Sequence, residues 1–179
     1  MLRSSLPFCR VSRPGSGAEE RDPEWFAVDL LWRNQGVHSP GNRENERDGC
    51  VALDVGIVVI GRNEGERLVQ CLESVLHLGL PVVYVDSGSA DDSAAIARSL
   101  GADVIELDRT RPFSAARSRN EGFERLSGRD PDIRFVQFLD GDCTLLPGWI
   151  EAAVRALSEQ PQRSAVIGHL LERNADASV

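Results

Sequence analysis

The stretch IRFVQFLDGDCT at residues 133–144 joins an apolar run to two carboxylates, Asp140 and Asp142, which are separated by one residue. Such a run is typical of a buried strand, and the Asp-x-Asp pair falls at its carboxyl end. Hard divalent cations such as Mg²⁺ and Mn²⁺ take carboxylate oxygens together with phosphate oxygens as ligands. The stretch therefore predicts a strand that ends in a metal-bridged phosphate site.

Around this stretch the chain alternates between strand-like and helix-like segments from residue 55 onward. Short apolar runs predict strands at 55–60, 82–85, 104–107, 133–139 and 165–167. Apolar residues at helical spacing predict helices at 68–76, 93–100, 114–126 and 147–157, with Ser114 as an N-cap. This alternation favours a parallel sheet covered on both faces, which binds ligands beyond the carboxyl ends of its strands.

The first 50 residues have a different character. Breakers at residues 14–17 and 39–42 and a polar run at 43–48 predict a poorly ordered leader or linker at 1–50. Residues 25–32 within it are compatible with one short helix or strand, which would serve as a docking element. The ordered domain is expected at residues 51–179.

Composition excludes several classes of function. The formal net charge of −8 argues against a nucleic-acid partner, which normally requires a basic face. All 20 basic residues are arginine, so chemistry that needs a lysine is excluded. The four cysteines have no zinc-site spacing and fit a reducing cytosol, and no apolar run approaches the roughly 20 residues of a membrane span.

Polar clusters follow three of the predicted strands, at residues 61–66, 86–93 and 140–142. Taken singly, each has an ordinary structural explanation, such as a helix cap at Asn63 or Ser89 or a turn at Asp86. Their joint occurrence at successive strand ends favours a ligand site instead.

In this order the clusters resemble the inverting family-2 glycosyltransferases, which use the GT-A fold. The matching stretches are VVIGRNE at 58–64, VDSGSAD at 85–91, SRNEG at 118–122 and LDGD at 139–142, which is followed by a proline and a helix. The resemblance covers about residues 55–172. It implies an α/β, Rossmann-like GT-A nucleotide-diphospho-sugar transferase fold, with a mostly parallel sheet and helices on both faces.

The resemblance also implies roles for individual residues. Asp86 would accept a hydrogen bond from the nucleotide base, and Arg119, or Arg117 in its place, would bond the base or neutralise phosphate. Asp140 would hold the ribose or a metal-bound water, and Asp142 would bind Mn²⁺ or Mg²⁺, so both act in catalysis through the metal. The other residues expected to bind the nucleotide sugar are Asn63, Glu64, Ser87, Gly88, Ser89 and Asn120.

The implied reaction moves a sugar, with inversion, from a nucleoside-diphosphate donor such as a UDP-sugar to an acceptor hydroxyl. The acceptor would be a saccharide or a lipid-linked molecule. The implied location is the cytoplasm, including peripheral association with the cytosolic face of a membrane.

The sequence departs from the family pattern in two places. Cys143 stands where many members carry a third acidic residue. The acceptor-side half, which supplies the general base, would follow the last predicted strand, where only residues 168–179 remain. None of His169, Glu172 and Asp176 lies in a recognisable base motif. The chain is therefore expected to be the donor-binding part of a transferase, truncated at its C-terminus and without an identifiable base.

Two alternatives remain open at this point. The chain fits a truncated, non-catalytic remnant that binds nucleotide sugar. Residues 140–144 also match the Asp-x-Asp-x-Thr motif of haloacid-dehalogenase-type phosphatases, in which Asp140 would attack phosphate and Asp142 would act as acid and base. Against the phosphatase, its motif belongs on a first strand, and the chain has no lysine.

Overall fold

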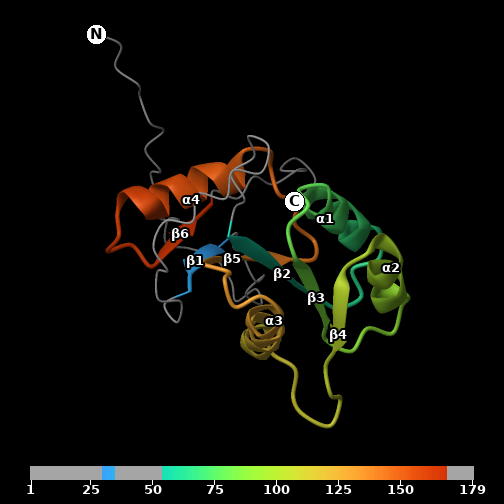
Figure 1. Ribbon diagram of the computed structural model, residues 1–179. Helices are drawn as coiled ribbons and strands as arrows, with labels where there is room; N and C mark the ends of the chain where they lie inside the picture. The colour runs from blue at the N-terminus through green and yellow to red at the C-terminus, as the bar shows by residue number, and fades with distance from the viewer. Residues whose placement is uncertain (1–29, 35–53, 169–179) are drawn as a thin grey trace, which may run out of the picture. The chain divides into compact units, whose positions relative to one another are not determined.

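The computed structural model describes residues 30–34 and 54–168. In this part of the chain six strands form one sheet in the order β4-β3-β2-β5-β1-β6 (Figure 1). The strands are β1 (Leu30–Arg33), β2 (Val55–Gly61), β3 (Val82–Asp86), β4 (Asp103–Glu106), β5 (Phe135–Asp140) and β6 (Ala165–Ile167). The pairs β2–β3, β2–β5 and β3–β4 are parallel, whereas β1 is antiparallel to both β5 and β6.

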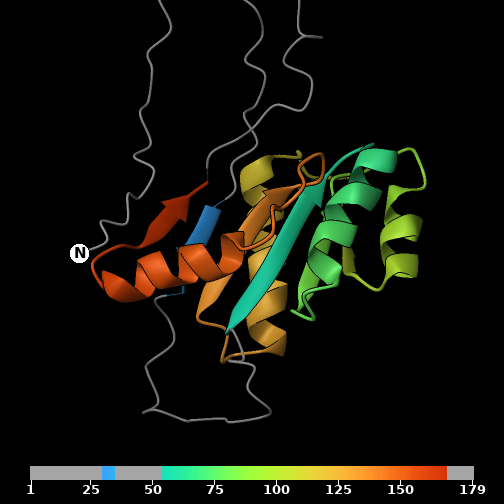
Figure 2. The same ribbon diagram turned by 90° about the horizontal axis from the view of Figure 1, so that it is seen from above.

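The described helices cover both faces of this sheet. They are α1 (Glu66–Leu76), α2 (Ser93–Leu100), α3 (Ala115–Arg129) and α4 (Trp149–Glu159). Helix α3 packs on β2 and β3, and it lies behind the strands in Figure 2, with α1 and α4 in front. The predicted α/β fold with a mostly parallel sheet and helices on both faces is confirmed.

Alternation along β2 divides the core between the two faces. Val55, Ile57 and Val59 pack in one cluster with buried residues of α1, α2 and α4. Val58 and Ile60 pack in the other cluster, which includes Leu126 of α3. Because successive side chains of a strand point to opposite faces, a strand buried on both faces is expected to be apolar along most of its length. This explains the uninterrupted apolar run at the start of the domain.

The predicted elements beyond residue 54 are all present, with their bounds shifted by at most three residues. Ser114 is the N-cap of α3, since its Oγ accepts the backbone N–H of Arg117 at 3.1 Å. The N-cap of helix α1 is Gly65, so the alternative explanation of Asn63 as a helix cap is wrong.

Strand β1 comes from the segment that the sequence assigns to the leader. It lies between β5 and β6, where Leu31 is completely buried and the Trp32 ring meets the Phe123 ring edge-to-face at 5.3 Å. Residues 30–33 therefore belong to the sheet. The domain boundary at residue 51 stays a prediction, and residues 1–29 and 35–50 of the leader lie outside the described residues.

Candidate functional site

The three polar clusters predicted from the sequence meet at one edge of the sheet. Strand β2 lies between β3 and β5, and all three run parallel. The register sets Gly61 opposite Asp86 and Ile60 opposite Asp140, so the two aspartates flank the carboxyl end of β2. The parallel order alone brings together side chains from positions more than 50 residues apart in the sequence.

The Asp86 carboxylate builds the loop that follows β3. It is only 2% exposed. Its Oδ2 accepts the N–H groups of Gly88 at 3.0 Å and Ser89 at 2.9 Å, and its Oδ1 accepts the hydroxyls of Tyr84 and Ser89. Burial, together with the Asp86 charge, raises the pKa of Tyr84 far above its usual range, so that hydroxyl stays a donor. Both Asp86 oxygens are thus used within the protein, and a direct role in reading a base stays a prediction.

Asn63 connects this loop to the loop after β2. Its backbone N–H donates to Ser89 Oγ at 2.9 Å, and its own Oδ1 accepts the N–H of Ala90 at 2.7 Å. Asn63 has a φ of 57°, a left-handed conformation that asparagine adopts more readily than most residues. The side chain therefore holds two predicted binding loops in one arrangement.

Gly88 allows the loop between β4 and α3 to pack closely against the loop after β3. Its φ is 82°, and a Cβ at this position would lie 2.6 Å from Cζ of Phe113, in the loop between β4 and α3. The guanidinium of Arg62 lies 5.5 Å from the centroid of the same ring. The sequence does not single out Phe113; the signal that marks it is an isolated aromatic residue directly before the N-cap of α3.

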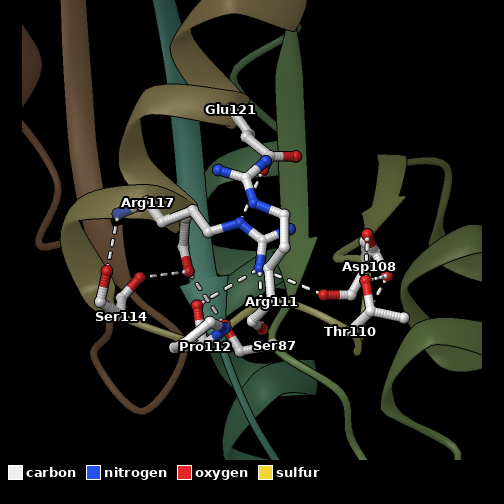
Figure 3. A network of polar contacts seen from close by, with 9 residues as sticks. Ser87, Asp108, Thr110, Arg111, Pro112, Ser114, Arg117 and Glu121 are labelled. Carbon is white, nitrogen blue, oxygen red and sulfur yellow. Dashed lines mark hydrogen bonds and ion pairs between the residues drawn. The ribbon is translucent and has the colours of Figure 1, made fainter.

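Arg117 holds the loop between β4 and α3 in place (Figure 3). Its Nε donates to Glu121 at 2.8 Å. Its Nη1 faces three loop carbonyls, at 3.1 Å from Asp108, 3.2 Å from Arg111 and 3.3 Å from Pro112. Only 12% of its side chain is exposed. Arg117 therefore bonds to the loop before α3. Of the two candidate arginines, Arg119 is the one that pairs with Asp140 at the end of β5.

Ser87 ties the loop after β3 to helix α3. Its hydroxyl lies 2.9 Å from the hydroxyl of Ser118, which in turn donates to the Ser114 carbonyl at 3.0 Å. Ser118 is completely buried. The helix is therefore anchored to the site one residue before Arg119.

Arg119 reaches the first carboxylate of the Asp-x-Asp pair. Its Nη2 lies 2.8 Å from Asp140 Oδ1, with 30% of the arginine side chain and 21% of the aspartate side chain exposed. Burial raises the pKa of Asp140 above its usual value; Arg119 opposes this shift, and the charge of Asp142 adds to it. The pair joins α3 directly to the end of β5.

Glu64 adds a third carboxylate to the Asp-x-Asp pair of Asp140 and Asp142. It forms an ion pair with Arg67 at 2.9 Å, although this contact lacks hydrogen-bond geometry and leaves Oε2 without a hydrogen-bond partner among the described residues. Burial is the main cause that raises the pKa of Glu64, and the charges of Asp142 and Asp140 raise it further. The three carboxylates are thus close enough to repel one another.

Asp142 differs from the other two carboxylates. It is exposed, and its Oδ1 has the Cys143 thiol at 3.7 Å. No arginine within residues 30–34 and 54–168 pairs with it. Asp142 is therefore the carboxylate best placed to take an incoming cation.

The described side chains supply only some of the ligands that a hard cation needs. In the described segments no group of three or more His, Cys, Asp or Glu side chains converges to hold a metal ion. Asp140 and Asp142 supply hard oxygen ligands, which suit Mg²⁺ or Mn²⁺ when further oxygens come from a bound phosphate. The residues present therefore fit a cation that arrives together with a phosphorylated ligand.

Asn120 is not brought to this edge. It is exposed and lines an open groove of about 750 Å³ on α3, whose other lining residues include Ile105 of β4 and Glu124. None of the residues that line the groove belongs to the three strand-end clusters. The remaining predicted site residues all lie in those clusters or, like Arg119, contact them.

Comparison with known proteins finds a match to the family model described as Glycosyl transferase family 2, over residues 56–177. The chain is 33% identical over 118 residues to a TPR repeat-containing protein of Synechococcus elongatus, in a match covering 65% of this chain and 27% of that protein. It is 34% identical over 114 residues to Glycosyltransferase AglE of Haloferax volcanii, covering 58% and 35%. It is 36% identical over 53 residues to 4,4'-diaponeurosporenoate glycosyltransferase of Staphylococcus aureus, covering 28% and 14%. The matches thus span about a third or less of the length of these relatives.

Proposed function

The chain belongs to glycosyl transferase family 2, and on this premise we propose that it binds a nucleoside-diphosphate sugar at the carboxyl edge of β2, β3 and β5. The sugar is transferred to an acceptor hydroxyl with inversion, assisted by Mn²⁺ or Mg²⁺. The observation that carries the proposal is the convergence of three loops at this edge, with Asp86 and Asp140 on either side of β2.

Each loop has a distinct task in this proposal. The loops after β2 and β3, locked together by Asn63, form the wall that receives the nucleoside. Asp140 orients the ribose or a bound water through the oxygen that Arg119 leaves open. Asp142, exposed and without an arginine partner in the described part of the chain, holds the cation.

A bound divalent cation would supply positive charge next to the diphosphate and so stabilise it as a leaving group. Residues at the edge contribute positioning: the carboxylates fix the donor, and the hydrogen-bonded loops after β2 and β3 limit its movement. The general base that removes the acceptor proton is not assigned, since His169, Glu172 and Asp176 lie outside the described residues.

The acceptor, a saccharide or a lipid-linked molecule, and a cytoplasmic location with peripheral membrane contact belong to the same proposal. Among the described helices, none has both the length and the apolar character needed to cross a bilayer. The phosphatase alternative is not carried further, because the family that matches is a glycosyl transferase family and its match includes residues 140–144.

The test is ³¹P NMR of the chain with uridine, guanosine and thymidine diphosphate sugars in the presence of Mg²⁺ and a simple sugar acceptor. The proposal expects one donor to release its nucleoside diphosphate, and the Asp142→Asn variant to release none. Saturable binding without release would leave the non-catalytic alternative. Neither binding nor release with any donor would overturn the proposal.

A further inference from the structure

We propose that Arg119 is a positioning residue that acts through Asp140: it holds Oδ1 of the carboxylate and leaves Oδ2 for the donor or its cation. The inference rests on the proposed function and assigns Arg119 a role different from direct contact with the donor. The Nη2–Oδ1 distance is 2.8 Å. Among the residues that the structure describes, Oδ2 of Asp140 accepts no hydrogen bond.

The other arginines near this edge are engaged in building loops. Arg67 pairs with Glu64, and Arg62 lies over the ring of Phe113. Arg109 donates to the carbonyl of Ser89 at 3.0 Å. Within residues 54–168, Arg119 is the arginine that pairs with a carboxylate of the Asp-x-Asp motif.

The backbone of Arg119 is held on both sides. The preceding residue, Ser118, is completely buried and bonds to Ser87. Gly122, one helical turn later, lies so close to the sheet that a Cβ there would be 2.4 Å from Cγ1 of Val58. A guanidinium on such a fixed segment can orient its partner before any ligand arrives, which reduces the ordering that binding requires.

The ion pair fixes one oxygen of the carboxylate only. The Asp140 side chain is 21% exposed, and its ion pair among the described residues is made through Oδ1 with Arg119. Without Arg119, the Asp140 carboxylate would have no ion-pair partner among the described residues and no fixed orientation.

A double-mutant cycle tests this inference, with uridine diphosphate and Mg²⁺ as the probe and isothermal titration as the readout. Arg119→Gln should weaken binding by about tenfold or more, the loss expected when a charged hydrogen bond is removed. Arg119→Lys should recover part of the affinity. In an Asp140→Asn background, Arg119→Gln should have little further effect. Arg155→Gln, which removes the same charge from an exposed site on α4, is the matched control and should bind normally.

A loss of the same size with and without the Asp140→Asn change would overturn the inference, because Arg119 would then act on the ligand directly. Normal binding by Arg119→Gln would overturn it as well. If the wild-type chain itself does not bind the probe, the proposed function fails first, and this is seen before any substitution is made.

A second measurement does not depend on the residual affinity of Asp140→Asn. The Nη–H signals of Arg119 in ¹⁵N NMR are identified by their loss in Arg119→Lys. These signals should keep their shifts and slow rotation when the ligand is saturating. Signals that move to a new environment on binding would show that the ion pair breaks, which contradicts the proposed role.

Discussion

The backbone N–H of Asn63 donates to the hydroxyl of Ser89 at 2.9 Å, so two loops that are 26 residues apart in the sequence share one hydrogen-bonded arrangement. The Asn63 side chain adds a second bond to the same loop, through the N–H of Ala90. Because Ser89 also bonds to Asp86, the network runs from the end of β2 to the end of β3. The shape of this half of the site is therefore set without a ligand.

Asn63→Ala should lower the free energy of unfolding by about 1–2 kcal/mol, since it removes the Ala90 bond and leaves alanine at a positive φ. Asn63→Gly should cost less, because glycine tolerates this backbone conformation. Urea unfolding measures both, with Asn120→Ala at an exposed position of α3 as the control. Equal losses in the two Asn63 variants would show that the backbone conformation contributes nothing.

Gly88→Ala should destabilise the chain more than Gly79→Ala does. Both glycines have positive φ, 82° and 67°, but a Cβ at Gly79 meets no atom within 4 Å, whereas one at Gly88 lies 2.6 Å from Phe113. Each variant should therefore lose about 1–3 kcal/mol from backbone strain, and Gly88→Ala should lose a further contribution from the displaced ring. Thermal melts compare them; equal melting points would mean that the ring moves away at no cost.

Leu31→Ala should lower the free energy of unfolding by about 2–5 kcal/mol, the usual cost of a cavity at a fully buried leucine. The result tests whether β1, which precedes the predicted domain boundary, is part of the folded unit. Leu146→Ala is the control, since Leu146 is 57% exposed and its truncation should change stability by less than about 0.5 kcal/mol. A Leu31 variant as stable as the control would place β1 outside the cooperative unit.

The raised pKa of Asp140 predicts a pH effect with a definite sign. Burial makes the folded state hold the Asp140 proton more tightly than the unfolded state does. The resulting contribution to stability is fully present below pH 3.8, the ordinary pKa of the side chain, and is lost as pH rises through the raised pKa of the folded state. Compared with Asp140→Asn, the ligand-free wild type should therefore lose stability between pH 3.8 and neutrality. Urea unfolding of both proteins at several pH values measures the difference. A wild type that gains relative stability over this range would show that the Arg119 pair outweighs burial.

Most of the fold follows from local signals in the sequence. Short β-branched runs such as residues 55–60 predict strands buried on both faces. A glycine such as Gly101, with a φ of 100°, ends its helix in the conformation that glycine favours. The placement of β1 does not follow, because a strand of four residues carries no signal of partners that lie more than 100 residues away.

The candidate site could be predicted from the sequence only in part. Parallel order brings the three clusters to one edge, and this is predictable from alternating strands and helices. Which arginine of α3 faces that edge is not predictable, because residues two apart on a helix point about 200° apart and the sequence does not set the rotation of the helix. The structure turns Arg119 to Asp140 and Arg117 to the loop before α3.

The central claim is that this edge binds a nucleoside diphosphate through a cation held at Asp142. A thermal melt with a panel of nucleoside diphosphates, each with and without Mn²⁺, tests it most directly on the wild type and on Asp142→Asn. One nucleotide should stabilise the wild type only when Mn²⁺ is present, by about 2.7 kcal/mol at a hundredfold excess over Kd. Asp142→Asn should melt like the wild type without ligand and show no such response. If no nucleotide stabilises the wild type, or if the variant responds equally, the claim is contradicted.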